Sequence, residues 1–200
     1  GGELLGLGIS LVGTIVPERK LWRFVARWPN VHMLDFHRVE RETGLAVSLR
    51  RIHDTELEYL IDKNDAYRRE NIILLHWGFG IGAAYAHAGR VLSSTTGEFG
   101  EIGHTIVDPA SRKRCQCGLL GCLETEASLW ALLPRIRRTH PEVRDFDQEL
   151  TELLGARAIL AFPPFRRALK YLTLGLVNMH RLFNPDRILF IGPVTENREV

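Results

Sequence analysis

Short apolar runs, separated by glycine, proline and charged residues, dominate the hydropathy pattern of this chain. Apolar runs of about four to eight residues are typical of buried strands. The run at residues 4–11 contains two glycines, and residues 21–28 alternate polar and apolar side chains in part before a Trp-Pro-Asn turn. The pattern predicts strands over residues 4–11, 21–28, 45–49, 71–77, 85–91 and 187–191.

Apolar residues at helical spacing predict helices between and after these strands. Residues 123–138 carry such a stripe, and Pro134 is expected to interrupt it. Pro163 suits the first turn of a long helix, which should end at Asn184-Pro185-Asp186. Further helices are expected over residues 34–43, closed by a glycine, from residue 55 onward, and within residues 146–161.

The composition is that of an ordinary globular domain, with 45% apolar and 25% charged residues among 200. The 26 basic and 24 acidic residues give a formal net charge of +2, which argues against a nucleic-acid-binding surface on this chain. Because no apolar run could span a bilayer and no signal peptide is visible, we expect no membrane association. Cysteines without a disulfide framework favour a reducing compartment, so a cytoplasmic protein is expected.

All three cysteines lie in one short segment, CQCGLLGC at residues 115–122. Together with His104 upstream, Cys115, Cys117 and Cys122 make a complete tetrahedral Cys3His set, which suits structural zinc. Two glycines in the segment allow a turn tight enough for the sulfurs to face one ion. Unrelated buried thiols would not be confined to one segment, and an odd count with Cys-x-Cys spacing suits disulfides badly.

The sequence GEFGEIGH at residues 97–104, followed by VDP and then CQCGLLGCLE at residues 115–124, resembles the signature of the ROK family of repressors, open reading frames and sugar kinases. The resemblance implies an α/β fold of the actin-like or hexokinase-like (ribonuclease H-like) type, with two lobes, a zinc-binding loop and a cleft for a sugar. It implies that zinc is bound by His104, Cys115, Cys117 and Cys122. It also implies that the sugar hydroxyls are reached by Glu101, His104 and Glu124, whose carboxylates and imidazole N–H can make such hydrogen bonds.

The resemblance covers nearly all of the chain but only the middle of the family pattern. Family members carry an Asp-x-Gly-Gly-Thr phosphate loop ahead of this point, and the repressors carry a winged helix-turn-helix before that; this chain has neither. We therefore expect a truncated fragment, with residues 1–70 as the remainder of the first lobe and residues 71–200 as a second lobe cut short at its C-terminal end. DNA binding would belong to an N-terminal domain absent from this chain.

The resemblance leaves the position of the kinases' general base open. These kinases have Glu-Asn-Asp-Ala-Asn at a strand-to-helix junction, where the aspartate accepts the proton of the sugar hydroxyl. Matching the His-Asp pair of similar repressors makes Asp54 the counterpart, whereas matching from the strand without a gap places Ile52 there. Asp54 would also suit the N-cap of the next helix, which is compatible with a sugar-binding role. Asn30 resembles another family position near the sugar, although Pro-Asn is also a common turn pair.

The segment that should bind the nucleotide departs from the family pattern. GFGIGAAY at residues 78–85 resembles the second phosphate loop, normally Gly-Thr-Gly-x-Gly-Ala-Gly, whose N–H groups and Thr hydroxyl hold the phosphates. Phe79 takes the place of the threonine and Ala84 that of the last glycine, and Pro193 stands in the glycine strip that lies against the adenosine in kinases. Phosphoryl transfer depends on positioning and charge stabilisation around the phosphates, so this departure argues against kinase activity.

These features favour the sugar-sensing and oligomerising domain of a bacterial transcriptional regulator, of the N-acetylglucosamine-repressor or xylose-repressor type. It would bind a monosaccharide effector, form a homodimer or tetramer, and lack kinase activity. The alternative is a zinc-containing sugar kinase with Asp54 as general base and with ATP and magnesium; a structural domain without ligands is the third hypothesis. Glucose, N-acetylglucosamine, N-acetylmannosamine and xylose would all suit the predicted carboxylates, so the sequence does not identify the sugar.

Overall fold

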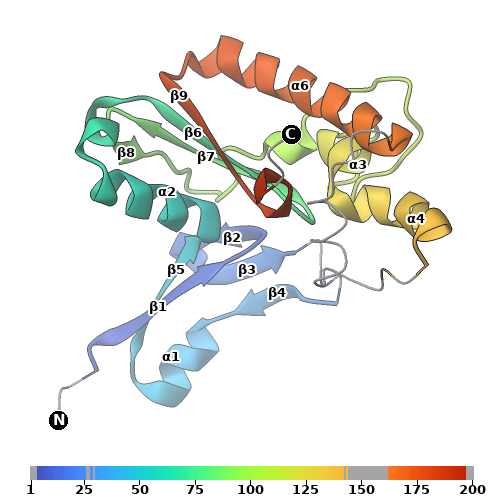
Figure 1. The fold of residues 1–200 in the computed structure, drawn as a ribbon. Helices are drawn as coiled ribbons and strands as arrows, with labels where there is room; N and C mark the ends of the chain where they lie inside the picture. The colour runs from blue at the N-terminus through green and yellow to red at the C-terminus, as the bar shows by residue number, and fades with distance from the viewer. Residues whose placement is uncertain (1–3, 26–27, 29, 142, 144–161, 197–200) are drawn as a thin grey trace. The chain divides into compact units, whose positions relative to one another are not determined.

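The computed structural model describes residues 4–25, 28, 30–141, 143 and 162–196 (Figure 1). The chain divides into two compact units. One consists of Gly1–Ile72 and Ala84–Gly100, and the other of Ile73–Ala83 and Glu101–Val200. The two lobes predicted at residues 1–70 and 71–200 stay a prediction, and each unit is described here by itself.

Two small sheets lie within the first unit. Strand β1 (Gly6–Leu11) pairs in parallel with β5 (Ala46–Arg51), while β2 (Thr14–Val16), β3 (Leu21–Phe24) and β4 (His32–Asp35) form an antiparallel sheet. Alternate residues of β5 are buried, because successive side chains of a strand point to opposite faces. The core of this unit consists of Ile15, Trp22, Val25, Val47 and Leu49.

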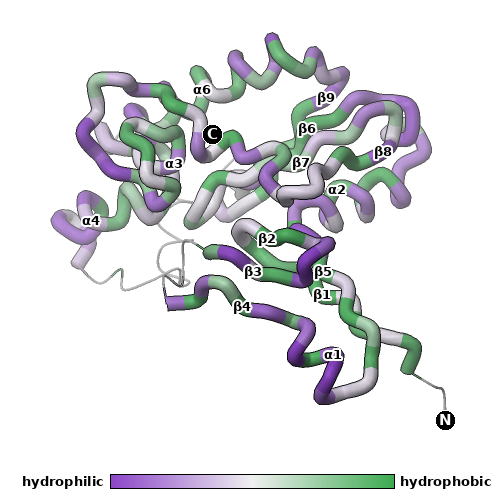
Figure 2. Tube along the Cα trace, turned by 180° about the vertical axis from the view of Figure 1, so that it is seen from behind, coloured by the Kyte–Doolittle hydropathy of each residue, from purple (hydrophilic) through white to green (hydrophobic). Residues whose placement is uncertain are grey.

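The helices of the first unit are α1 (His37–Thr43) and α2 (Ile52–Lys63), with short 3-10 turns η1 (Pro17–Arg19) and η2 (Asp65–Arg69). Gly44 ends α1 with a φ of 71°, as the sequence predicted. The predicted start of this helix is wrong, because Leu34 lies in β4 and pairs with Trp22 of β3. Strand pairing thus replaces the expected first helical turn. Helix α1 has no buried residue and is mainly hydrophilic in Figure 2.

A four-stranded sheet has the order β8-β7-β6-β9. It contains β6 (Ile72–Trp77), β7 (Ile81–His87), β8 (Arg90–Val91) and β9 (Arg187–Ile191), and β7 pairs with β8 in an antiparallel hairpin. Five of the six residues of β6 are buried, so this strand reads as a continuous apolar run rather than an alternating one. The burial of β6 agrees with the buried strand that the apolar run at residues 71–77 predicted.

The helices of the second unit are α3 (Leu123–Ala127), α4 (Leu129–Thr139) and α6 (Pro163–Phe183), with 3-10 turns η3 (Ile102–His104) and η5 (Pro193–Glu196). The predicted bounds of α6 are confirmed, and Asn184 ends it in the left-handed conformation with a φ of 41°. The ring of Phe165 on α6 stacks on Trp77 of β6 with centroids 5.2 Å apart. This contact packs α6 against β6.

The prediction of one helix over residues 123–138 is wrong. Ser128 is extended, with φ −68° and ψ 157°, and separates α3 from α4. Its side-chain oxygen accepts from the backbone N–H of Ala131 at 3.4 Å, so it caps the second helix. Pro134 lies inside α4 rather than interrupting the helix. The helix predicted within residues 146–161 lies outside the described residues.

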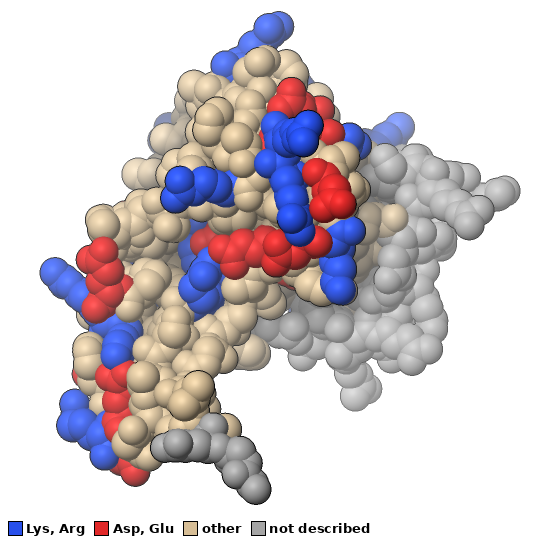
Figure 3. All heavy atoms as spheres, turned by 90° about the vertical axis from the view of Figure 1, so that its left-hand side faces the viewer, with Lys and Arg blue, Asp and Glu red and all other residues tan. Residues whose placement is uncertain are grey.

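Charged side chains are mixed in sign on the face shown in Figure 3, where Lys and Arg lie beside Asp and Glu. This arrangement agrees with the near-balanced net charge of +2. Among the described residues, no helix has the length and apolar character needed to cross a membrane.

Candidate functional site

His104 and the three cysteines lie together, as the sequence predicted. Their four candidate ligand atoms are all within 4.8 Å of one another. His104 ends η3, and Cys122 is the N-cap of α3. Between them, the backbone N–H of Cys115 donates to the carbonyl of Leu119 at 2.8 Å and closes the turn that contains Cys117.

The distances within this cluster match those around a tetrahedral zinc ion. Zn–S bonds of about 2.3 Å and a Zn–N bond of about 2.0 Å place two sulfurs about 3.8 Å apart and a sulfur and a nitrogen about 3.5 Å apart. The Cys117 and Cys122 sulfurs are 3.7 Å apart, and Cys115 Sγ lies 3.4 Å from His104 Nδ1. A disulfide would need sulfurs about 2.05 Å apart, and none of the three cysteines forms one.

The electrostatics of the cluster also suit a bound cation. Burial raises the pKa of Cys115 to about 11 and also raises the pKa of Cys122, and the neighbouring sulfurs add to both shifts. Thiolates held this close repel one another unless a cation neutralises them. The donor set and its distances are therefore consistent with a zinc site formed by His104, Cys115, Cys117 and Cys122.

Two of the predicted sugar-binding carboxylates lie beside His104. Because His104 Nδ1 faces the cysteines, its Nε2 points the other way and lies 3.7 Å from Glu101 Oε2. Glu124, the second residue of α3, is only 5% exposed. Burial raises the pKa of Glu124, and the nearby His104 opposes that shift. The structure thus brings Glu101, His104 and Glu124 together, and their contact with a sugar stays a prediction.

Two hydrogen bonds hold the Glu124 carboxylate. Its Oε2 accepts from the backbone N–H of Ile81 at 3.3 Å, and its Oε1 accepts from the indole N–H of Trp130 at 3.3 Å. Sequence reasoning assigned Trp130 to an apolar helix face and missed this contact. Gly103 is packed between the Ile81 carbonyl and Glu124, and a Cβ there would come within 3.0 Å of Glu124 Oε2. The same Cβ would lie 2.4 Å from the Ile81 carbonyl oxygen, which is backbone, so this position requires glycine.

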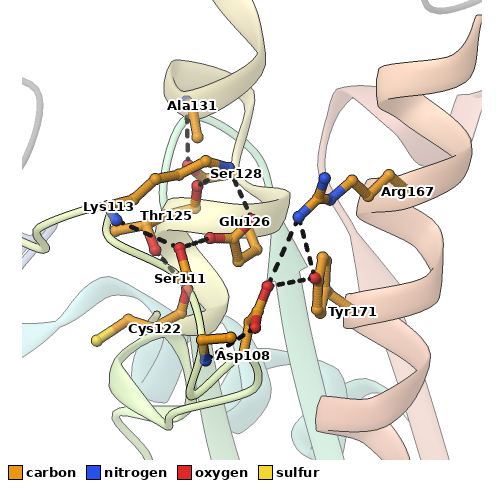
Figure 4. Close-up of polar contacts among 11 residues, drawn as sticks. Asp108, Ser111, Lys113, Cys122, Thr125, Glu126, Ser128, Ala131, Arg167 and Tyr171 are labelled. Carbon is orange, nitrogen blue, oxygen red and sulfur yellow. Dashed lines mark hydrogen bonds and ion pairs between the residues drawn. The ribbon is translucent and has the colours of Figure 1, made fainter. Parts of the chain in front are cut away.

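The loop from Asp108 to Cys122, which we call the zinc loop, is joined to α3 by an ion pair that the sequence did not indicate (Figure 4). The Glu126 side chain is fully buried and accepts from Ser111 Oγ at 2.6 Å and from Lys113 Nζ at 2.7 Å. Lys113 Nζ also donates to the carbonyl of Thr125 at 3.2 Å. These bonds connect the segment between Asp108 and the cysteines to the helix that carries Glu124.

A second attachment joins the same loop to α6 (Figure 4). The Tyr171 hydroxyl donates to Asp108 Oδ2 at 2.5 Å, and this hydrogen bond is the main reason that the pKa of Asp108 is lowered. The Arg167 guanidinium lies 3.6 Å from the same oxygen and donates to Tyr171 Oη at 3.2 Å. The partners are 63 residues apart in sequence, so no local pattern could have predicted them.

Asp54 belongs to the first unit and is not the N-cap of its helix. Helix α2 begins at Ile52 with Arg51 as N-cap, which places Asp54 inside the first turn. Asp54 is 4% exposed, and burial raises its pKa while Arg51, at 3.9 Å, opposes the shift. The N-cap interpretation is therefore wrong. The match of Asp54, or of Ile52, to the kinases' base stays a prediction. Asn30 is an exposed turn residue of the same unit.

In the glycine-rich hairpin between β6 and β7, several backbone N–H and carbonyl groups form hydrogen bonds with other groups of the second unit. The N–H of Gly78 donates to the Gly80 carbonyl at 3.1 Å, and the N–H of Ile81 donates to Glu124. Two carbonyls of the hairpin accept hydrogen bonds from the first turn of α4. The Leu129 N–H donates to the Gly78 carbonyl at 3.0 Å, and the Trp130 N–H donates to the Phe79 carbonyl at 3.2 Å.

Besides Phe79, two residues depart from the kinase pattern, Ala84 and Pro193, and both lie in regular secondary structure. Ala84 is buried in β7 at 1% exposure. Pro193 opens η5 directly after Gly192, whose φ of 122° is one that side chains rarely adopt. A Cβ at Gly192 would collide with the Trp77 carbonyl, so this turn packs closely on β6.

Comparison with known proteins identifies the same family that the sequence motifs resemble. The ROK family model matches residues 1–200. A glucokinase of Halalkalibacterium halodurans is 27% identical over 213 residues, which cover 97% of this chain and 63% of the relative. The DNA-binding transcriptional dual regulator NagC of Escherichia coli is 30% identical over 209 residues, covering 99% of this chain and 50% of the relative.

A crystal structure of a ROK family transcriptional regulator, described as a homologue of the E. coli Mlc protein, superposes with a TM-score of 0.72 at 27% identity. The match covers 97% of this chain and 51% of that one. The chain therefore spans about half to two thirds of the length of these relatives, which include both kinases and repressors. With the whole chain matched and the expected α/β actin-like fold present, the chain belongs to the ROK family.

Proposed function

We propose that this chain is the sugar-binding part of a ROK-type transcriptional regulator and has no kinase activity. The observation that carries the proposal is the bonding of the hairpin at residues 78–81. A phosphate loop must direct its N–H groups at the nucleotide, whereas two of these N–H groups already have acceptors in the protein, Gly80 O and Glu124 Oε2. Phe79 adds no hydroxyl for a phosphate.

Zinc would have a structural role in this function. Four protein ligands leave no coordination position for a substrate, so the ion would hold the loop rather than take part in chemistry. Coordination through Nδ1 would fix the His104 ring and leave its Nε2–H to donate to a sugar hydroxyl. The carboxylates of Glu101 and Glu124 would accept hydrogen bonds from neighbouring hydroxyls. Asn30 and Asp54 stay sugar-binding candidates from the resemblance alone.

A sugar kinase is the second candidate, and one observation favours it. Asp54 is a buried carboxyl in a helix first turn with a raised pKa, which suits a general base for a sugar hydroxyl. The glucokinase among the relatives is compatible with this function. Such an enzyme would need ATP and magnesium, and the hairpin at residues 78–81 would have to release its internal hydrogen bonds to hold the phosphates.

Other parts of the proposal concern the whole protein. The printed name of the NagC relative describes DNA binding, and we propose that any DNA binding here would belong to a part of the protein outside residues 1–200. A homodimer or tetramer is expected for the regulator, and light scattering coupled to size-exclusion chromatography would measure its mass. The predicted lobes, residues 1–70 and 71–200, would be tested by limited proteolysis.

Calorimetry on the zinc-loaded, full-length protein tests the proposal, with glucose, N-acetylglucosamine, N-acetylmannosamine and xylose as probes. Glu124→Gln should weaken binding of the preferred sugar by about tenfold or more, because a charged acceptor is lost, while zinc stays at one per chain. Glu18→Ala, at an exposed glutamate of η1, is the control and should bind as the wild type does. Unchanged affinity in Glu124→Gln, or no binding of any of the four sugars by the wild type, would contradict the proposal.

A further inference from the structure

Trp130 reaches Glu124 only because the helix between them is broken. In a continuous helix two residues six positions apart are rotated by about 240° and lie about 9 Å apart along the axis, so their side chains do not meet. The extended backbone of Ser128 redirects the chain between α3 and α4. The indole N–H of Trp130 can therefore donate to Glu124 Oε1 at 3.3 Å.

A closed ring of hydrogen bonds surrounds this contact. The backbone N–H of Trp130 donates to the Phe79 carbonyl, which fixes the residue against the hairpin. Two positions further along, the N–H of Ile81 donates to the other carboxylate oxygen of Glu124. Trp130 is thus bonded to the hairpin through its backbone and to Glu124 through its side chain, and the hairpin is bonded to Glu124 as well.

We propose that Trp130 is a positioning residue of the sugar site, holding the Glu124 carboxylate in one orientation through its indole N–H. The inference rests on the proposed sugar-binding function and adds a residue to it. A carboxylate has about four acceptor directions on two oxygens. The donors from Ile81 and Trp130 take one on each oxygen, so both oxygens keep capacity for sugar hydroxyls.

Without the indole N–H, the Glu124 carboxylate would keep one protein donor, the N–H of Ile81, instead of two. Glu124 is 5% exposed, so water replaces a missing donor poorly, and a carboxylate that loses one of two donors can rotate. A sugar would then have to order the carboxylate as it binds, which costs affinity. Removing the indole N–H should weaken sugar binding by about tenfold, with zinc unaffected.

The test compares Trp130→Phe with Trp77→Phe in zinc-loaded, full-length protein. Both substitutions delete an indole N–H and keep an aromatic ring, but the Trp77 indole donates to the carbonyl of Ala127 rather than to a carboxylate. Calorimetry with glucose and N-acetylglucosamine measures affinity, and elemental analysis measures zinc. We expect Trp130→Phe to bind the preferred sugar about tenfold more weakly, and Trp77→Phe to melt at a lower temperature with near wild-type affinity.

A second measurement detects the hydrogen bond itself. In ¹⁵N-labelled protein, Glu124→Gln should shift the Trp130 indole N–H resonance without sugar, and adding the preferred sugar to the wild type should shift it too. A merely structural tryptophan would respond to neither change. Wild-type sugar affinity in Trp130→Phe, or an indole resonance unmoved by Glu124→Gln, would overturn this inference while leaving the proposed function intact. If the wild type binds none of the sugars, the proposed function fails and the inference with it.

Discussion

Replacing Cys117 by serine should remove the zinc ion without disturbing the packing around it. Cys117 is exposed, whereas Cys115 and Cys122 are buried, so this ligand can be changed without creating a cavity. Its sulfur lies 3.7 Å from that of Cys122, close to the separation expected for two zinc-bound thiolates. Serine is a poor zinc ligand at neutral pH, and the remaining three donors would bind the ion far more weakly.

The expected decrease in melting temperature follows from the linkage between metal binding and folding. An ion present at about 1,000 times its dissociation constant stabilises the folded protein by about 4 kcal/mol. For a chain of this size, each kcal/mol moves the melting temperature by about 2–4 °C, so loss of the ion should lower it by about 8–16 °C. Chelator should produce the same decrease in the wild type and almost none in Cys117→Ser.

The assay combines differential scanning calorimetry with elemental analysis. Gln116→Ser changes the exposed neighbour of Cys117 in the same turn and should keep both the metal and the melting temperature. One zinc per chain in Cys117→Ser, or an equal loss of metal in Gln116→Ser, would refute the assignment of the ligands.

Two further predictions concern the attachments of the zinc loop. Lys113→Met should destabilise the protein by about 1–3 kcal/mol in urea unfolding, because it leaves the buried Glu126 with one fewer donor, and Arg112→Met at the exposed neighbouring residue should have little effect. Tyr171→Phe should lower stability near neutral pH, and the difference from the wild type should shrink as the pH falls below about 4. The sign follows because the hydrogen bond lowers the pKa of Asp108, so its contribution is present above the unfolded-state pKa and is lost as the pH falls through the folded-state value. Urea titrations across this range with chelator present would measure it, and a difference that grows in acid would contradict the reasoning.

The sequence predicted best where local chemistry decides the structure. Helix α6 has proline at its start and Asn184-Pro185 at its end, and both bounds are as predicted. The cysteines and His104 lie close together in sequence, so their spacing was enough to predict a common cluster. In each case the decisive residues act within a few positions of one another.

Predictions failed where a distant contact or a local helix break outweighs the apolar pattern of the chain. Leu34 fits the apolar stripe of a helix, but it pairs with Trp22 on the neighbouring strand. The break between α3 and α4 had a local sign, a serine before an apolar run, which the helical spacing of the surrounding residues concealed. The bond between Tyr171 and Asp108 joins residues far apart in sequence, and no periodicity could predict it.

The central claim is that this protein binds a sugar but does not phosphorylate it. A coupled ADP-release assay on the full-length protein, with ATP, magnesium and the sugar that calorimetry shows to bind, tests the claim most directly. Each lost donor around a developing charge typically costs about two to three orders of magnitude in rate. We therefore predict no ADP release above the sugar-free rate. Sugar-dependent turnover of about one per second or faster, abolished by Asp54→Asn, would contradict the account and establish the kinase.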